Sequence, residues 1–166
     1  MPRPLCFYPF RDKKHVSSHF GAPTFARRDF LYLWQLGNHS TTFKNYIAND
    51  DRIYVMGRCF AGSDAVLASE SGRLDGTHSC SPGELAEIFY KHGLPINSRA
   101  HIRIHACSSA TPAAGPNFAT EFAKEMAKKS YHVTIRGYDV AVGMYVVGRL
   151  TVDKHAIDYH PSQNPM

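Results

Sequence analysis

Cys107 is the residue of this sequence that is best placed to do chemistry. It ends the alternating apolar run "HIRIHAC" and precedes the small, flexible stretch "SSATPAAG". A thiol at a strand end can attack a carbonyl carbon, and the backbone amides of the turn behind it can form an oxyanion hole. Ser108 and Ser109, the next two residues, are therefore candidate binding residues. The alternative is that Cys107 packs as a small buried side chain, as most cysteines do.

A second apolar run, residues 53–56, stops at Gly57 and is followed by Arg58 and Cys59. Ligands of open α/β sheets bind beyond the carboxyl ends of the strands, so both strand ends are candidate site positions. Arg58 stays protonated and cannot act as a general base, but its charge can lower the pKa of a nearby thiol. Because adjacent strands lie less than about 5 Å apart, Cys59 and Cys107 can form a disulfide if their side chains converge; otherwise they are two independent buried thiols.

The loops between the predicted strands supply further candidates. His78, in "DGTHSCS", lies between the two strands in sequence and is the best candidate for a general base; a solvated loop histidine is the alternative. Asp64 and Asp139 lie in loops near the same edge. They are candidates for binding a basic substrate side chain, although isolated surface aspartates are common.

A well-signalled helix must connect the two strand ends. In "SPGELAEIFYKHG", Ser81 is the predicted N-cap, Pro82 takes the first position and Glu84 completes a capping box. Gly93 is the predicted stop. His92, just before it, is expected to carry a favourable charge at the helix C-terminus.

The remaining pattern predicts an α/β fold with a mostly parallel central sheet flanked by helices. Strands at 53–56, 102–106 and 133–136 are expected to run parallel, joined by helices near 82–92 and 116–129, because strand–helix–strand connections are right-handed crossovers. The second helix is predicted from the i, i+4, i+8 spacing of its buried residues, Phe118, Phe122 and Met126.

The rest of the chain carries weaker signals. Residues 1–30 are expected to form an irregular N-terminal arm or an edge strand, and residues 31–160 a single α/β domain. Residues 28–37 are typical of a buried strand or a short helix, and residues 58–80 of a long surface loop with a small hairpin. The tail from residue 158 is expected to be frayed.

Composition narrows the function classes. With 166 residues, 43% of them hydrophobic and 20% charged, the chain fits one ordinary globular domain. The net charge of +5 comes from scattered basic residues, so nucleic-acid binding is not expected. His101 and His105 are about 13 Å apart if they share a strand, which is too far for one metal ion, and the glycines form no nucleotide-binding pattern. We expect no metal and no cofactor.

Cysteine usage and the first residues bear on location. The four cysteines show neither a CxxC pair nor the dense spacing of a disulfide scaffold, which favours a reducing compartment. The stretch "MPRPLCFYPFRDKK" has only a short apolar patch broken by prolines, so neither a secretory signal nor a membrane span is expected. The expected location is the cytoplasm, or outside the cell after export by a route that needs no signal.

The order of these segments resembles the caspase-like fold of clan CD cysteine peptidases. The resemblance rests on the apolar strand ending in Gly57, the helix "SPGELAEIFYKHGLP", the strand "IRIHACSS", the helix "FATEFAKEMAKK" and the strand "VTIRGYDVAVG", and it spans roughly residues 50–145. The chain is most similar to the self-processing cysteine-protease domains of large bacterial toxins and to their effector-like relatives.

The resemblance implies a strand-end cysteine, which Cys107 matches, and a His-Gly pair at the end of the first strand, which is not matched. Arg58 stands where the family has histidine, and Cys59 where it has glycine. Three hypotheses follow. The chain is a cysteine peptidase that acts on a protein or peptide with Cys107 as nucleophile and His78 as base, or a catalytically inactive binding or adhesion module, or it carries a Cys59–Cys107 redox pair.

Overall fold

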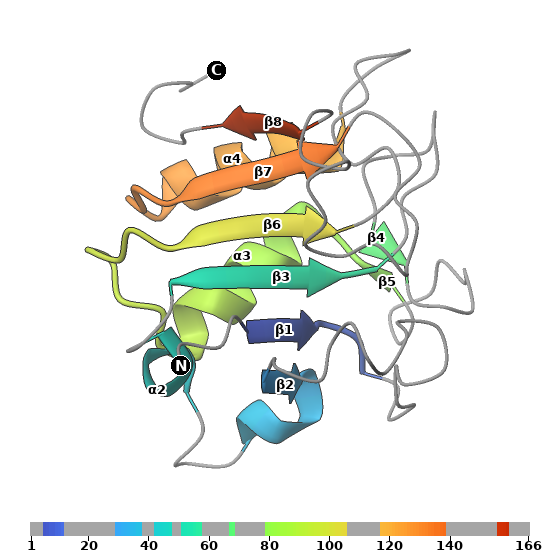
Figure 1. Cartoon of the computed structure of the whole chain (residues 1–166), viewed down its shortest axis with the longest axis vertical. Helices are drawn as coiled ribbons and strands as arrows, with labels where there is room; N and C mark the ends of the chain where they lie inside the picture. Colours follow the sequence, from blue (N-terminus) through green and yellow to red (C-terminus); the bar gives the residue numbers. More distant parts are fainter. Residues whose placement is uncertain are drawn as a thin grey trace.

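A six-stranded sheet organises the computed structural model of the chain (Figure 1). The structure describes residues 5–11, 29–37, 42–47, 51–57, 67–68, 79–105, 117–138 and 156–159. The strand order is β2-β1-β3-β6-β7-β8, and β4 and β5 form a separate antiparallel pair. The strands are β1 Leu5–Tyr8, β2 Asp29–Tyr32, β3 Arg52–Met56, β4 Leu67–Ala68, β5 Ser79–Cys80, β6 His101–His105, β7 Thr134–Tyr138 and β8 Ala156–Tyr159.

Within the six-stranded sheet, the neighbouring strands β2, β1, β3, β6 and β7 are parallel. The last strand of the sheet, β8, runs antiparallel to β7. The predicted α/β class with a mostly parallel sheet is therefore confirmed. So are the parallel strands predicted at 53–56, 102–106 and 133–136, which the structure places within two residues of those bounds.

Helix α3 (Pro82–Lys91) begins and ends as its sequence predicts. The Ser81 hydroxyl accepts a hydrogen bond from the Glu84 amide at 3.1 Å, and the Glu84 carboxylate accepts one from the Ser81 amide at 3.4 Å. Gly93 follows the helix with φ +86°, a left-handed conformation that glycine adopts without strain.

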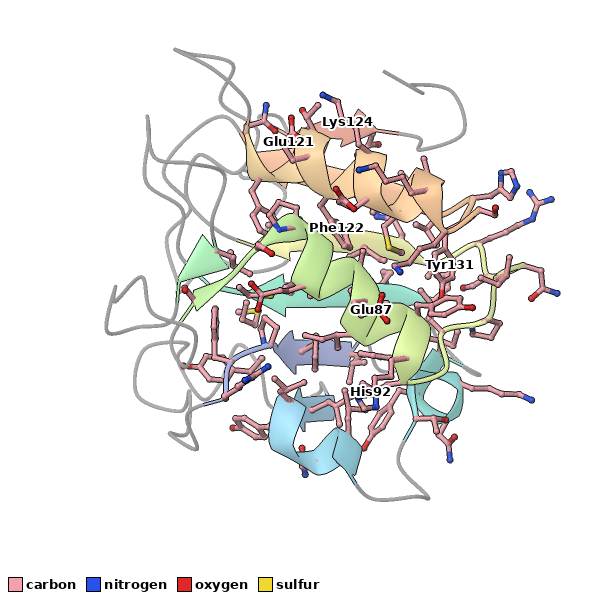
Figure 2. The ribbon with its side chains drawn as sticks, turned by 180° about the vertical axis from the view of Figure 1, so that it is seen from behind. Glu87, His92, Glu121, Phe122, Lys124 and Tyr131 are labelled. Carbon is pink, nitrogen blue, oxygen red and sulfur yellow. The ribbon has the colours of Figure 1, made fainter. Side chains whose placement is uncertain are left out.

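Helix α4 (Phe118–Lys128) packs beside α3, and both cover the same face of the sheet (Figure 2). Its predicted stripe is buried, and Phe122 lies 6.0 Å from Phe89 of α3, ring centre to ring centre. The aromatic core continues from Phe89 to Phe43 of the short helix α2 (Phe43–Ile47) and to Phe7 of β1. Burial of these rings against the sheet supplies much of the force that holds the helices on it.

The expectation of an irregular arm over residues 1–30 needs a correction. Residues 5–8 form β1, which lies inside the sheet between β2 and β3, and all four of its residues are buried. A strand buried on both faces carries a continuous apolar run without alternation. The run "LCFYPF" is of this kind, but the surrounding prolines make it look like irregular chain.

Three short segments can also be compared with their predicted structure. Residues 29–37 contain both of the predicted possibilities, β2 followed by a 3-10 helix, Leu33–Gly37. The small hairpin-like pair expected within 58–80 is present as β4 and β5. Asp158 and Tyr159 belong to β8, so the expectation of a frayed tail from residue 158 is wrong for these two residues. No helix in the described ranges is long and apolar enough to cross a membrane.

Candidate functional site

The carboxyl ends of β3 and β6 are level with one another. The register pairs Val55 with Ile104 and Met56 with His105, and the arrowheads of both strands point the same way (Figure 1). Gly57, which follows β3, is buried. This edge is where open α/β sheets bind their ligands.

The strand order identifies a second feature of the same edge. From β1 the chain moves outward to β2, whereas from β3 it moves the opposite way, to β6 and β7. The direction therefore reverses between β1 and β3, and such a reversal opens a crevice beyond the carboxyl ends of the two strands. Pro9 and Arg11 follow β1 at this point.

None of the predicted site residues is among those that the structure describes. They are Arg58, Cys59, Asp64, His78, Cys107, Ser108, Ser109 and Asp139. Their mutual geometry, including a Cys59–Cys107 disulfide, therefore stays a prediction. What the structure does give is the position of the strands to which several of them are attached.

The two described cysteines are unsuited to nucleophilic chemistry. Cys6 and Cys80 are buried, and neither forms a disulfide. Burial, and secondarily the Glu84 carboxylate, raise the pKa of the Cys80 thiol far above its usual range, although the Arg11 charge acts in the opposite direction. Since the thiolate is the reactive form, Cys80 is inert at neutral pH.

Three of the described histidines lie at the amino edge of the sheet, away from the predicted site. His92 follows α3, His101 begins β6 and His132 precedes β7. His101 and His105 begin and end β6, so about 13 Å of strand separates His101 from the carboxyl edge. These histidines are too far away to take a proton directly from a thiol at the carboxyl edge.

A polar cluster near His101 ties the edge of the sheet together. Arg136 of β7 donates two hydrogen bonds to the Asp158 carboxylate of β8, at 2.8 and 3.1 Å. Arg103 donates to the Tyr54 hydroxyl at 3.0 Å and lies over the Tyr54 ring. Burial, followed by the Arg103 and Arg136 charges, lowers the pKa of His101. We interpret this cluster as structural, because the Arg136–Asp158 ion pair joins the neighbouring strands β7 and β8.

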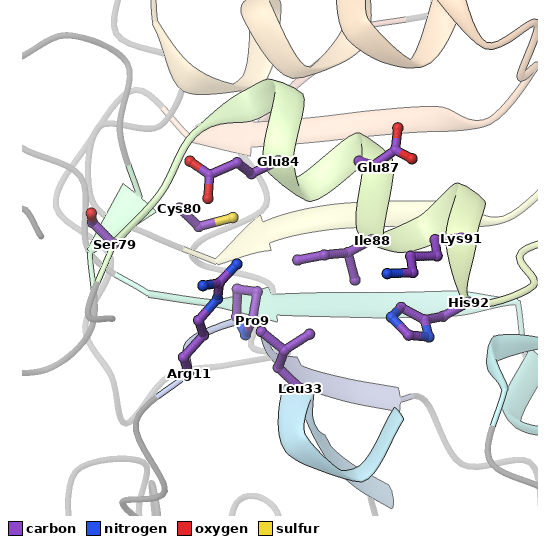
Figure 3. A pocket seen from close by; sticks show the side chains of 10 residues that line it. All are labelled: Pro9, Arg11, Leu33, Ser79, Cys80, Glu84, Glu87, Ile88, Lys91 and His92. Carbon is purple, nitrogen blue, oxygen red and sulfur yellow. The ribbon is translucent and has the colours of Figure 1, made fainter. Parts of the chain in front are cut away.

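A groove of about 380 Å³ runs along α3 on the helix-covered side of the molecule (Figure 3). Arg11, Ser79 and Cys80 lie at one end, and Lys91 and His92 at the other. The lining residues come from the chain after β1, the 3-10 helix, β5 and α3: Pro9, Arg11, Leu33, Ser79, Cys80, Glu84, Glu87, Ile88, Lys91 and His92.

The sequence patterns do not single out this groove. Its helical side is visible in retrospect, because Glu84, Ile88 and Lys91 follow the i, i+4, i+7 spacing of one helix face. Arg11 and Leu33 come from distant segments that only the sheet topology brings there. The expected charge on His92 needs a correction: burial and the neighbouring Lys91 lower its pKa.

Comparison with known proteins adds no family assignment. No protein-family model matches the sequence, and no curated protein matches it.

Proposed function

We propose that the chain is a cysteine-peptidase-like protein of the bacterial effector or toxin-associated kind, with Cys107 as nucleophile at the carboxyl edge of the sheet. The observation that carries the proposal is the level ending of β3 and β6. Cys107 is the second residue after β6, and Arg58 and Cys59 are the second and third after β3. Two residues of extended chain span at most about 7 Å and three at most about 11 Å, so covalent geometry limits how far these residues can lie from the two strand ends.

The connectivity supports the proposal as well. The resemblance to caspase-like peptidases implies parallel strands joined by covering helices, in the order strand, α3, strand, α4, strand. The described chain has that order over residues 52–138. The inertness of Cys6 and Cys80 further reduces the candidate nucleophiles to Cys59 and Cys107.

The proposed reaction is hydrolysis of a peptide bond. The Cys107 sulfur bonds to the carbonyl carbon, the carbon–nitrogen bond breaks, and the amine leaves with a proton from the acid–base group. Water then cleaves the thioester and releases the acid, returning the proton to the thiol. His78 is the proposed acid–base group, and Arg58 favours the thiolate by its charge.

Cleavage assays with the wild type and three variants test this proposal. Wild type should cleave a peptide library or its own chain, and Cys107→Ala should abolish the activity. If His78 is the base, His78→Ala should lower the rate about 10²- to 10⁴-fold, the usual contribution of proton transfer. His132→Ala is the matched control, because His132 is exposed at the opposite edge and should leave the rate unchanged.

Arg58→His separates the remaining possibilities. If Arg58 has simply displaced the base, restoring histidine should raise cleavage by about 10²- to 10⁴-fold. If His78 already serves, the change should do little. If neither the wild type nor Arg58→His cleaves peptides or its own chain, the peptidase proposal is contradicted.

The second candidate is a catalytically inactive binding or adhesion module on the same scaffold. Two observations favour it: Arg58 stands in the place of the family's histidine, and of the described histidines His105 alone lies at the carboxyl edge, whereas His92, His101 and His132 lie at the far edge. In this case Cys107→Ala should leave the biological effect of the protein unchanged.

A further inference from the structure

We propose that the groove along α3 binds a free α-amino acid with a long, mainly apolar side chain, and that tyrosine is the best match. This inference goes beyond the proposed peptidase function and is independent of it, because it uses only described residues and does not involve Cys107. It rests on three features of the groove: opposite charges at one end, an apolar centre, and a hydrogen-bonding pair at the other end.

The end of the groove at Cys80 carries one positive and one negative side chain. Arg11 and Glu84 are both exposed, and they lie on opposite sides of the Cys80 sulfur (Figure 3). After burial, the Glu84 carboxylate raises the pKa of the Cys80 thiol and the Arg11 guanidinium lowers it, so both charges face this sulfur. In the part of the chain that the structure describes, Arg11 and Glu84 form no ion pair with each other. This end of the groove therefore presents two separate charges and has no net charge.

A ligand that gains from both charges must carry both charges itself. A lone anion would be attracted by Arg11 and repelled by Glu84, and a lone cation would experience the reverse. An α-amino acid carries a carboxylate and an ammonium group on one carbon, so the first can accept from Arg11 while the second donates to Glu84. One Glu84 oxygen, Oε1, accepts the Ser81 amide, and a carboxylate has a second oxygen for such a bond.

The centre of the groove is apolar. Pro9, Leu33 and Ile88 lie between the Arg11 end and the Lys91 end (Figure 3). None of these three side chains can form a hydrogen bond, so the part of the ligand that lies against them must be apolar as well. The volume of about 380 Å³ is within the range of small-molecule sites, which are mainly apolar with a few placed polar groups.

The opposite end of the groove presents a hydrogen-bond donor beside an acceptor. The Lys91 ammonium group lies next to the His92 imidazole (Figure 3). Burial, followed by the Lys91 charge, lowers the pKa of His92, so its imidazole is neutral at pH 7 and one ring nitrogen accepts. The Glu87 carboxylate, which also lines the groove, forms an ion pair with Lys129. A neutral hydroxyl group can accept from Lys91 and donate to His92.

The length of the groove identifies the amino acid. The groove follows α3 from Glu84 to Lys91, seven residues that span about 10 Å at the helical rise. The hydroxyl groups of serine and threonine lie next to the backbone and cannot bridge this length. Tyrosine has an apolar body and a polar tip, so it places a ring against the apolar centre and a hydroxyl at the far end.

NMR titration of isotope-labelled protein with tyrosine and its analogues tests the proposal. Tyrosine should bind and shift the amide signals of α3. Tyramine, which lacks the carboxylate, and desaminotyrosine, which lacks the ammonium group, should each bind about tenfold more weakly, as expected for losing one hydrogen bond to a charged group. Phenylalanine should also bind more weakly than tyrosine, because it lacks the hydroxyl group.

Two variants assign the charges of the ligand to their partners. Arg11→Gln should weaken tyrosine binding about tenfold but should not weaken tyramine binding, because tyramine has no carboxylate. Glu84→Gln should weaken tyrosine binding by a similar factor but should not weaken binding of desaminotyrosine, which has no ammonium group. Glutamine also completes a capping box, so α3 should stay folded in Glu84→Gln.

Lys128→Gln is the control. It removes a charge from an exposed position on α4, outside the groove, and should leave the affinity for tyrosine unchanged. Thermal unfolding followed by circular dichroism checks that each variant is folded. The proposal is overturned if tyrosine does not bind, if tyramine or desaminotyrosine binds as tightly, or if the folded Arg11→Gln and Glu84→Gln variants bind tyrosine as Lys128→Gln does. Phenylalanine bound as tightly as tyrosine would overturn the role of Lys91 and His92.

Discussion

At the scale of single residues, burial decides which titratable groups of this chain are chemically available. It raises the pKa of the Cys80 thiol and lowers the pKa of His101, so each favours its neutral form. The candidate residues of the carboxyl edge were predicted from residue type and from position after a strand. Whether they meet cannot be predicted that way, because it depends on the path of the loops that carry them.

His101 should make the stability of the fold sensitive to acid. Its pKa in the folded chain lies below the usual 6.5, mainly through burial and then through Arg103 and Arg136, while Asp158 and Asp51 act in the opposite direction. As the pH falls below 6.5, the unfolded chain takes up a proton that the folded chain does not. The free energy of unfolding should therefore be unaffected by His101 above pH 6.5. It should decrease as the pH falls from 6.5 to the pKa of His101 in the folded chain.

Urea unfolding at pH 7.5 and pH 5.5 measures this loss. In His101→Gln the loss between the two pH values should be smaller than in wild type, because one of the groups with a lowered pKa is gone. His132→Gln, a change to an exposed histidine at the same edge, is the control. An equal loss in wild type and His101→Gln would show that His101 does not contribute.

At the scale of elements, the sequence predicts those helix and strand bounds that have local causes. The bounds of α3 follow from Ser81, Glu84 and Gly93, all within or next to the helix. Strands β1 and β8, of four residues each, have no such signals, because they are held by pairing with distant strands. The same holds for the groove, whose two sides are far apart in sequence.

Gly93 should be the most sensitive position at the end of α3. The Leu94 amide donates to the Phe89 carbonyl at 2.9 Å, which closes the helix around a residue with φ +86°. A Cβ at position 93 would lie 3.3 Å from the Thr42 Cβ. Gly93→Ala should therefore lower the free energy of unfolding by about 1–2 kcal/mol, the cost of the left-handed conformation for an L-residue.

Gly37→Ala is the control for this prediction. Position 37 has no heavy atom within 4 Å of an added Cβ, so the change should have little effect on stability. Chemical denaturation of the two variants beside wild type gives the comparison. Equal stabilities of Gly93→Ala and Gly37→Ala would contradict the role assigned to the backbone at Gly93.

At the scale of the whole molecule, the sheet topology brings the candidate regions together. The order β2-β1-β3-β6-β7-β8 places the reversal of chain direction at the carboxyl ends of β1 and β3. The end of the groove at Arg11 lies after β1, and Arg58 follows Gly57 after β3. The sequence predicts the β3–β6 neighbourhood because a single helix joins these strands. It does not predict that β1 lies beside them, because that pairing crosses long stretches of chain.

The rate at which iodoacetamide labels each cysteine, followed by peptide mass spectrometry from pH 5 to pH 9, tests most directly whether the carboxyl edge holds an activated thiol. We expect Cys107 to react first at pH 7, about tenfold faster than an ordinary thiol, because a lowered pKa increases its thiolate fraction. Cys6 and Cys80 are buried internal references and should react last. The account is contradicted if Cys107 is labelled as slowly as Cys6 and Cys80. It is also contradicted if the labelling rate of Cys107 follows the pH dependence of an unperturbed thiol, with a pKa near 8.5.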